Sequence, residues 1–147
     1  LVAAATGHTL LDYFSLLVRY YRPHVILLES TDRMAHQLID LPSNAILLAS
    51  VFDRHSRMVE SVLRMFHERD MTTILLTNRS STPMRRHADH VLLVASEAST
   101  AFRSRVCYLI LLESLVAALA PSDPDVERDR VRAMQGLFDD LGVFITP

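Results

Sequence analysis

Residues 46–60 read ILLASVFDRHSRMVE, and this stretch decides the fold class. An apolar run ends at Ser50, a short charged segment follows, and apolar residues then return at helical spacing. This pattern predicts a buried strand, a turn and a helix. In parallel α/β folds such a turn lies at the carboxyl end of its strand, where ligands bind. The turn that starts at Ser50 is therefore the first candidate for a functional site.

The same alternation of apolar runs and helical segments extends along the chain in both directions. Short runs without a polar face predict parallel strands that are covered on both sides. We therefore expect an α/β fold, a three-layer αβα sandwich with a five-stranded parallel sheet. The expected strands are residues 1–5, 25–28, 45–49, 72–76 and 91–94, and the expected helices are residues 9–21, 31–39, 55–69, 83–88, 99–120 and 124–141.

The composition is that of a single globular domain. The chain has 147 residues, half of them apolar, which is enough to bury one core. The formal net charge is −2 and no basic stripe follows an expected helix, so this chain alone is a poor DNA-binding surface. No apolar run approaches the roughly 20 residues of a membrane helix, and no signal peptide opens the chain. We expect a cytoplasmic protein without a membrane partner.

All fifteen basic residues are arginines, and the chain has no lysine. This excludes a lysine Schiff base and a P-loop lysine, but guanidinium groups still suit bidentate contacts to phosphate. The single cysteine, Cys107, excludes an internal disulfide and lies in an apolar stretch that favours a buried thiol. His87 and His90 flank Asp89 at a spacing that matches no zinc template, and we expect neither a metal nor another cofactor.

Three expected turns carry hydroxyl-bearing or charged side chains. Parallel strands bring their carboxyl ends to one edge of the sheet, so these turns should line one pocket. In the first turn, the helix start beside Gly7 favours an anion, although a capping role for Thr9 explains the same pattern. The candidate ligand contacts are Gly7 and Thr9 in the first turn, Ser50, Asp53, Arg54 and His55 in the second, and Thr77, Ser80 and Ser81 in the third.

The stretch LLTNRSSTPMRRHADHVLLVASE, residues 75–97, resembles the pattern of the sugar isomerase (SIS) domain. In that pattern a strand leads into T-[DN]-x-x-x-[ST]-P-[LM]-x-x-x-A-D-x-V-L, and an acidic residue follows the last strand. Glu97 fills the acidic place, so the resemblance adds it to the candidate ligand contacts. The chain is most similar in pattern to the SIS domains of RpiR-type transcriptional regulators. The resemblance implies a flavodoxin-like SIS fold with strand order 2-1-3-4-5.

The resemblance also implies a function. An RpiR-type SIS domain senses a phosphosugar or a similar anionic metabolite and dimerises. We expect residues 1–147 to form a single SIS domain, with residues 120–147 as a helical extension. Because the chain starts at Leu1 within an apolar run, we expect a helix-turn-helix domain upstream of it, and contact with DNA only through that domain.

The second turn departs from S-x-S-G-x-T, the phosphate-binding sequence typical of the family. Only the first serine is kept, since Phe52, Asp53 and His55 replace the second serine, the glycine and the threonine. The Asp53 carboxylate opposes a bound phosphate, and Arg54 or Arg57 could offset its charge. Asp53 could instead cap the following helix, and His55 could be a solvated residue of the first helical turn.

Two other functions fit the same residues. An aldose-ketose isomerase needs a base near the C1 and C2 carbons and an acid at the carbonyl oxygen, and Glu97 with His55 or His87 could supply them. Glu97 could equally be a charge at the start of a helix. The altered second turn also fits a SIS domain that has lost its ligand and only dimerises. We assign no residue a catalytic role.

The expected helix at residues 99–120 is apolar on nearly all sides. Such a helix is either central in its domain or covered in an oligomer, and SIS domains dimerise through helices of this kind. We therefore expect a homodimer or a higher homo-oligomer with its ligand clefts near the interface. The last helix should pack on this one through Val131, Met134, Leu137 and Phe138.

Overall fold

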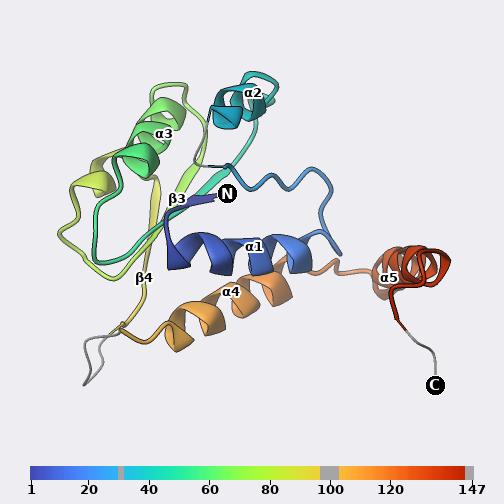
Figure 1. Ribbon diagram of the computed structural model, residues 1–147. Helices are drawn as coiled ribbons and strands as arrows, with labels where there is room; N and C mark the ends of the chain where they lie inside the picture. Colours follow the sequence, from blue (N-terminus) through green and yellow to red (C-terminus); the bar gives the residue numbers. More distant parts are fainter. Residues whose placement is uncertain (30–31, 97–102, 145–147) are drawn as a thin grey trace.

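A parallel sheet lies between two layers of helices (Figure 1). The computed structural model describes residues 1–29, 32–96 and 103–144. Neighbouring strands follow the order β1-β2-β3-β4, and each pair is parallel. The strands are β1 (Val2–Ala3), β2 (Leu47–Val51), β3 (Thr73–Thr77) and β4 (His90–Leu93). The helices are α1 (Thr6–Val18), α2 (Arg33–Ile39), α3 (Arg57–His67), the 3₁₀ helix η1 (Pro83–His87), α4 (Val106–Leu119) and α5 (Pro124–Asp140).

The two helical layers cover opposite faces of the sheet, which confirms the expected α/β sandwich. Strand residues alternate between the faces: Leu47 and Ala49 belong to one core cluster, and Leu48 belongs to the other. Helices α2, α3 and η1 contribute to the first cluster, and α1 and α4 contribute to the second. All five residues of β2 are buried because the strand is covered on both sides.

The expected sheet of five strands is wrong for the described residues, which form four strands. Residues 25–28 run beside Leu1, but only two backbone hydrogen bonds, of 2.8 and 2.7 Å, join them to it. Because β1 has only two residues, no longer ladder forms. The side chains of Arg19 and Gln37 donate to two carbonyls of this segment at 3.0 and 3.3 Å.

Helix α1 begins at Thr6, three residues earlier than expected. The chain turns directly from β1 into the helix through Ala5, which has φ 51° and ψ −131°. Thr9 therefore lies within the helix, where it is exposed, and the capping role considered for it is wrong. No side chain caps α1.

Helix α4 begins at Val106, and residues 99–102 of the expected helix lie outside the described residues. One side of α4 is buried against α1 and the sheet, through Tyr108 and Leu112. Its other side is exposed, and Ile110 is 57% exposed there. Cys107 directly precedes the buried Tyr108. Because adjacent helical residues point about 100° apart, the Cys107 side chain lies on the exposed side. The expectation of a buried thiol is therefore wrong.

Helix α5 projects beyond the sandwich instead of packing along α4 (Figure 1). The chain bends by 114° between the two helices, where Pro121 follows the end of α4 and Pro124 begins α5. None of the residues of α5 is buried. The expected packing on α4 is therefore wrong for its four residues, Val131, Met134, Leu137 and Phe138.

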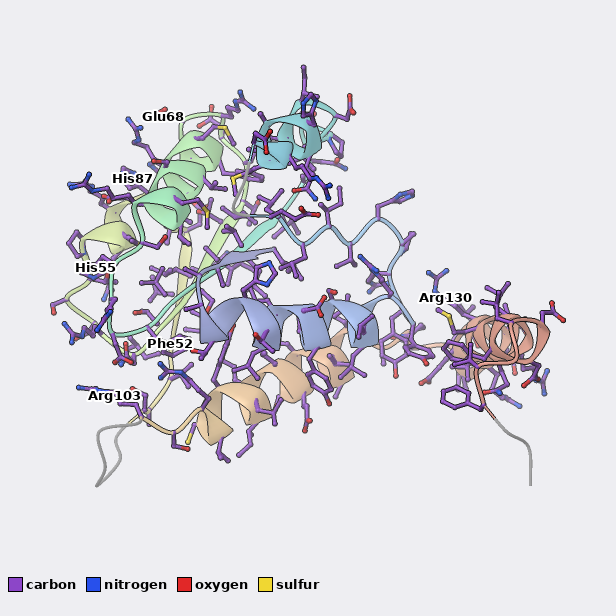
Figure 2. The ribbon with its side chains drawn as sticks, viewed as in Figure 1. Phe52, His55, Glu68, His87, Arg103 and Arg130 are labelled. Carbon is purple, nitrogen blue, oxygen red and sulfur yellow. The ribbon has the colours of Figure 1, made fainter. Side chains whose placement is uncertain are left out.

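Hydrogen bonds tie α5 to the end of α1. Arg130 donates from Nε and Nη2 to the Arg19 carbonyl at 3.1 and 2.9 Å, on the side of α5 nearest the sandwich (Figure 2). The Tyr21 hydroxyl donates to Glu127 Oε1 at 3.2 Å. In the part of the chain that the structure describes, no single helix is long and apolar enough to cross a membrane, and only the bent pair α4 and α5 together meets the test of length and composition.

Candidate functional site

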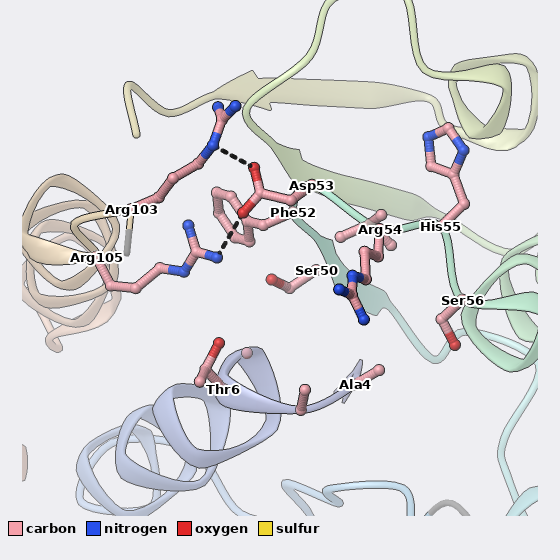
Figure 3. A pocket seen from close by; sticks show the side chains of 13 residues that line it. Ala4, Thr6, Ser50, Phe52, Asp53, Arg54, His55, Ser56, Arg103 and Arg105 are labelled. Atoms are coloured by element: carbon pink, nitrogen blue, oxygen red, sulfur yellow. Dashed lines mark hydrogen bonds and ion pairs between the residues drawn. The ribbon is translucent and has the colours of Figure 1, made fainter. Parts of the chain in front are cut away.

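A cleft of about 690 Å³ opens at the carboxyl ends of β1 and β2 (Figure 3). Its walls are the turn after β1, the turn after β2 and two arginines that precede α4. Two of the three turns expected at this edge of the sheet thus meet in one pocket. The lining residues are Ala4, Ala5, Thr6, Gly7, Ser50, Val51, Phe52, Asp53, Arg54, His55, Ser56, Arg103 and Arg105.

The turn after β1 brings the amino end of α1 against β2. Ala5 makes this turn with a positive φ of 51°, which is rare for residues with a side chain. Gly7 is buried against the strand, where an added Cβ would lie 3.3 Å from Ala3 Cβ and 3.4 Å from Ser50 Oγ. The glycine therefore lets the positive end of the helix dipole approach Ser50.

Three buried polar atoms at this end of the molecule make no hydrogen bond of good geometry among the described residues. They are the hydroxyls of Ser50 and Tyr108 and Nη1 of Arg105. Ser50 and Tyr108 are only 3% and 1% exposed. Buried polar groups are normally hydrogen-bonded, so each of these atoms can still bind a partner. Because Ser50 and Arg105 line the cleft, their atoms mark this side of it as a place for a polar ligand.

Phe52 forms an aromatic wall that positions Arg105. Its ring centroid lies 4.7 Å from that of Tyr108, and the Arg105 guanidinium carbon lies 4.8 Å from the Phe52 centroid. A guanidinium over an aromatic face is attracted by the ring. Burial raises the pKa of the Tyr108 hydroxyl to about 12, while a weak hydrogen-bond interaction with the Ser50 hydroxyl and the charge of Arg105 act in the opposite direction. Tyr108 is thus a protonated hydrogen-bond donor.

Asp53 is bound by two arginines and an asparagine. Arg105 Nη2 donates to Asp53 Oδ2 at 2.9 Å, and Arg103 Nε lies 3.3 Å from Oδ1 (Figure 3). Asn78 donates to Oδ1 at 2.8 Å, and its own Oδ1 accepts from the Asp53 N–H at 3.2 Å. Burial raises the pKa of the Asp53 carboxyl, but hydrogen bonds from Arg105 and Asn78 and the charges of both arginines outweigh it. The pKa consequently lies below its usual range.

The backbone at Asp53 has the conformation that favours glycine. Its φ of 57° lies in the left-handed region, which favours glycine and which aspartate tolerates better than most residues. Ser56, not Asp53, caps α3, because its hydroxyl accepts from the Val59 N–H at 3.4 Å. The capping role considered for Asp53 is therefore wrong. The two arginines before α4, rather than Arg54 or Arg57, offset its charge.

The cleft brings together five of the predicted ligand contacts, and four others do not line it. Gly7, Ser50, Asp53, Arg54 and His55 line it. Thr9 is exposed within α1, and Ser80 and Ser81 are exposed in the loop after β3. Thr77 is buried, and its hydroxyl accepts from the Arg79 N–H at 3.3 Å. Glu97 lies outside the described residues.

The third turn, after β3, contacts two residues that line the cleft. Asn78 holds the Asp53 carboxylate and also donates to the Ser96 hydroxyl at 2.7 Å. The Thr82 hydroxyl lies 3.3 Å from His55 Nε2. The turn therefore orients two residues of the second turn instead of lining the pocket itself.

Arg103, Arg105 and Tyr108 were missed by the reasoning from sequence. Arg105 is separated from Asp53 by 52 residues, and no periodicity connects the two. One signal was present, since both arginines precede the amino end of an apolar helix. The helix dipole disfavours cations at that end, so their position indicates a negative partner elsewhere.

The fold is that of an α/β domain with a cleft at the carboxyl edge of a parallel sheet, the place where such folds bind ligands. The SIS domain family matches residues 21–118, about two thirds of the chain. The chain therefore belongs to the SIS domain family. Among curated protein sequences, no relative matches it.

Solved structures share this fold. The sugar isomerase domain of the RpiR transcription factor from Sphaerobacter thermophilus is 22% identical with a TM-score of 0.78, over 87% of this chain and 72% of that chain. The Vibrio vulnificus NanR protein complexed with ManNAc-6P is 20% identical with a TM-score of 0.75, over 95% of this chain and 54% of its own. This chain thus spans about half the length of NanR. A hypothetical protein, 12% identical with a TM-score of 0.65, matches over 88% of this chain and 74% of its own.

Proposed function

We propose that this domain is the effector-sensing part of an RpiR-type transcriptional regulator, and that a phosphosugar or a similar anionic metabolite binds in the cleft. The observation that carries the proposal is that Ser50 and Arg105 line the same cleft, and that the buried Ser50 hydroxyl and Arg105 Nη1 make no hydrogen bond of good geometry among the described residues. Ser50 lies between Arg105 and Arg54 in Figure 3. A hydroxyl, two guanidinium groups and a helix amino end are groups that bind phosphate.

The comparisons support the same ligand class. NanR was solved with ManNAc-6P, a phosphorylated sugar, and its fold matches this chain. The signal from the ligand passes through a homodimer: the ligand prefers one arrangement of the two copies and thereby biases DNA-binding domains elsewhere in the protein. Residues 1–147 act as one SIS domain in the cytoplasm, with residues 120–147 as its helical extension.

Isothermal titration calorimetry with ManNAc-6P, glucose 6-phosphate and inorganic phosphate tests the proposal. Ser50→Ala and Arg105→Gln should each weaken binding of a phosphorylated sugar by about tenfold or more, because a hydrogen bond to a charged group is worth about 1.5–3 kcal/mol. Ser61→Ala, on the exposed side of α3, is the matched control and should leave the affinity unchanged.

Two results would contradict the proposal. If no phosphorylated sugar binds at millimolar concentration, the domain serves dimerisation alone. If an aldose or ketose phosphate is converted, and Glu97→Gln abolishes the turnover, the domain is an isomerase. Enzymatic assay of the same sugars at high protein concentration separates these cases.

A further inference from the structure

Asp53 shares Arg105 with the place proposed for the ligand. One amino group of Arg105, Nη2, is bonded to the Asp53 carboxylate at 2.9 Å. The other, Nη1, is buried and has no partner among the described residues. The side chains of Arg105 and Asp53 are only 23% and 26% exposed, so solvent screens this pair less than a surface pair. An anion that binds Nη1 therefore lies close to a fixed negative charge.

Asp53 is the only carboxylate among the described residues that line the cleft, against three arginines. Its position is fixed twice. The backbone holds a φ of 57°, and Asn78 binds both the N–H and the carboxylate of Asp53 while it donates to Ser96. A ligand must therefore share Arg105 with Asp53, since these contacts oppose displacement of the carboxylate.

We propose that Asp53 is a built-in counter-ion that sets which anions the cleft accepts. It holds Arg103 and Arg105 in place when no ligand is bound, and it weakens binding of doubly charged groups more than binding of singly charged or neutral ones. This inference rests on the proposed function, because it concerns the same cleft. The residues that determine the preferred charge of the ligand are then Arg103, Arg105 and Asp53.

Calorimetry on Asp53→Asn tests the inference. Asparagine has the same shape and tolerates the left-handed backbone, so the fold should be kept. Removal of the charge should tighten binding of ManNAc-6P and of inorganic phosphate by roughly tenfold at low salt. The affinity for unphosphorylated ManNAc should not change. Glu60→Gln removes a carboxylate that is paired with Arg86 at 3.3 Å outside the cleft, and this control should alter neither affinity.

Asp53→Gly provides a second variant, because the left-handed backbone is unstrained in glycine. It should also bind the phosphorylated ligands more tightly than the wild type does. If the wild type binds and both variants bind equally or more weakly, the inference is wrong while the proposed function stands. If only the variants bind, the inference stands and the native domain is not a phosphosugar sensor. If no form binds any phosphorylated ligand, both are wrong.

Discussion

Asp89 ties the segment before β4 to the start of β3. Its Oδ2 accepts from the backbone N–H and from the hydroxyl of Thr73, each at 2.7 Å. Its own N–H donates to the Thr73 hydroxyl oxygen at 3.0 Å, and Thr73 is fully buried. The side-chain and backbone hydrogen bonds from Thr73 are the main causes that lower the pKa of the Asp89 carboxyl. The A-D step of the family pattern thus has a structural role in this chain.

Asp89→Asn should lower the melting temperature at pH 7, because an amide is a weaker acceptor for both bonds. The pKa of Asp89 is lower in the folded than in the unfolded chain, so its stabilisation is complete above the unfolded value of about 4 and is lost as the pH falls through the folded value. The difference from wild type should therefore shrink below about pH 4. Thermal melts by circular dichroism at several pH values measure it.

A matched control for this variant is Asp40→Asn, which changes an exposed carboxylate after α2. It should leave the melting temperature almost unchanged over the same pH range. A loss of stability in Asp89→Asn that is constant with pH would contradict the assignment of these hydrogen bonds to the ionised carboxylate.

Helix α3 has residues at both of its ends that stabilise a helix. Ser56 caps it, Glu60 lies in the first turn, and Arg64 and His67 lie in the last turn, which suits the helix dipole. Its inner side buries the apolar residues Val59, Val62, Leu63 and Phe66. Because α3 directly follows the turn after β2, a stable α3 holds the end of this turn in place.

Ser56→Ala should lower the free energy of unfolding by about 1 kcal/mol, because the Val59 N–H loses its acceptor. Urea denaturation followed by circular dichroism gives this value. Ser61→Ala changes an exposed serine within the same helix and should be neutral or slightly stabilising, since alanine is the better helix former. Equal stability of Ser56→Ala and wild type would show that another group caps the helix.

The local elements of this fold were predictable, and their partners were not. β2 and α3 follow from an apolar run and a helical spacing, which depend only on neighbouring residues. Residues 25–28 have the composition of a strand, but a strand also needs a ladder partner, and β1 offers two residues. Arg105 reaches the cleft because α4 packs beside α1, a long-range contact that no local pattern specifies. Five of the ten ligand contacts predicted from sequence thus line the cleft.

Exposed apolar side chains remain on the outer side of α4 after the domain has folded. Val106 and Ile110 are 62% and 57% exposed, and Ala117 and the charged Glu113 are exposed on the same side of the helix. Apolar side chains gathered on one face are typical of protein interfaces. The face begins next to Arg103 and Arg105, so a second copy on it would lie close to the cleft. This position suits the proposed transfer of the ligand signal through a dimer.

Ile110→Glu should therefore convert a dimer into monomers, because a charge buried without a partner strongly disfavours association. Size-exclusion chromatography with light scattering measures the mass. Ile39→Glu is the matched control, since this isoleucine is 81% exposed on α2, in the other helical layer. A wild-type protein that is monomeric at high concentration, or an equal effect of both variants, would contradict the proposed interface.

The cations of the cleft are all arginines, and this choice has a consequence for how the domain responds to acidity. Guanidinium groups stay charged at every pH at which a protein is folded, and the lowered pKa of Asp53 keeps its carboxylate ionised as well. A phosphate monoester acquires its second charge near pH 6. His55 also lines the cleft, and a His55→Gln variant removes this ionisable side chain. In that variant, the titration of the bound metabolite itself would therefore govern how much of the cleft is occupied between about pH 5 and 8.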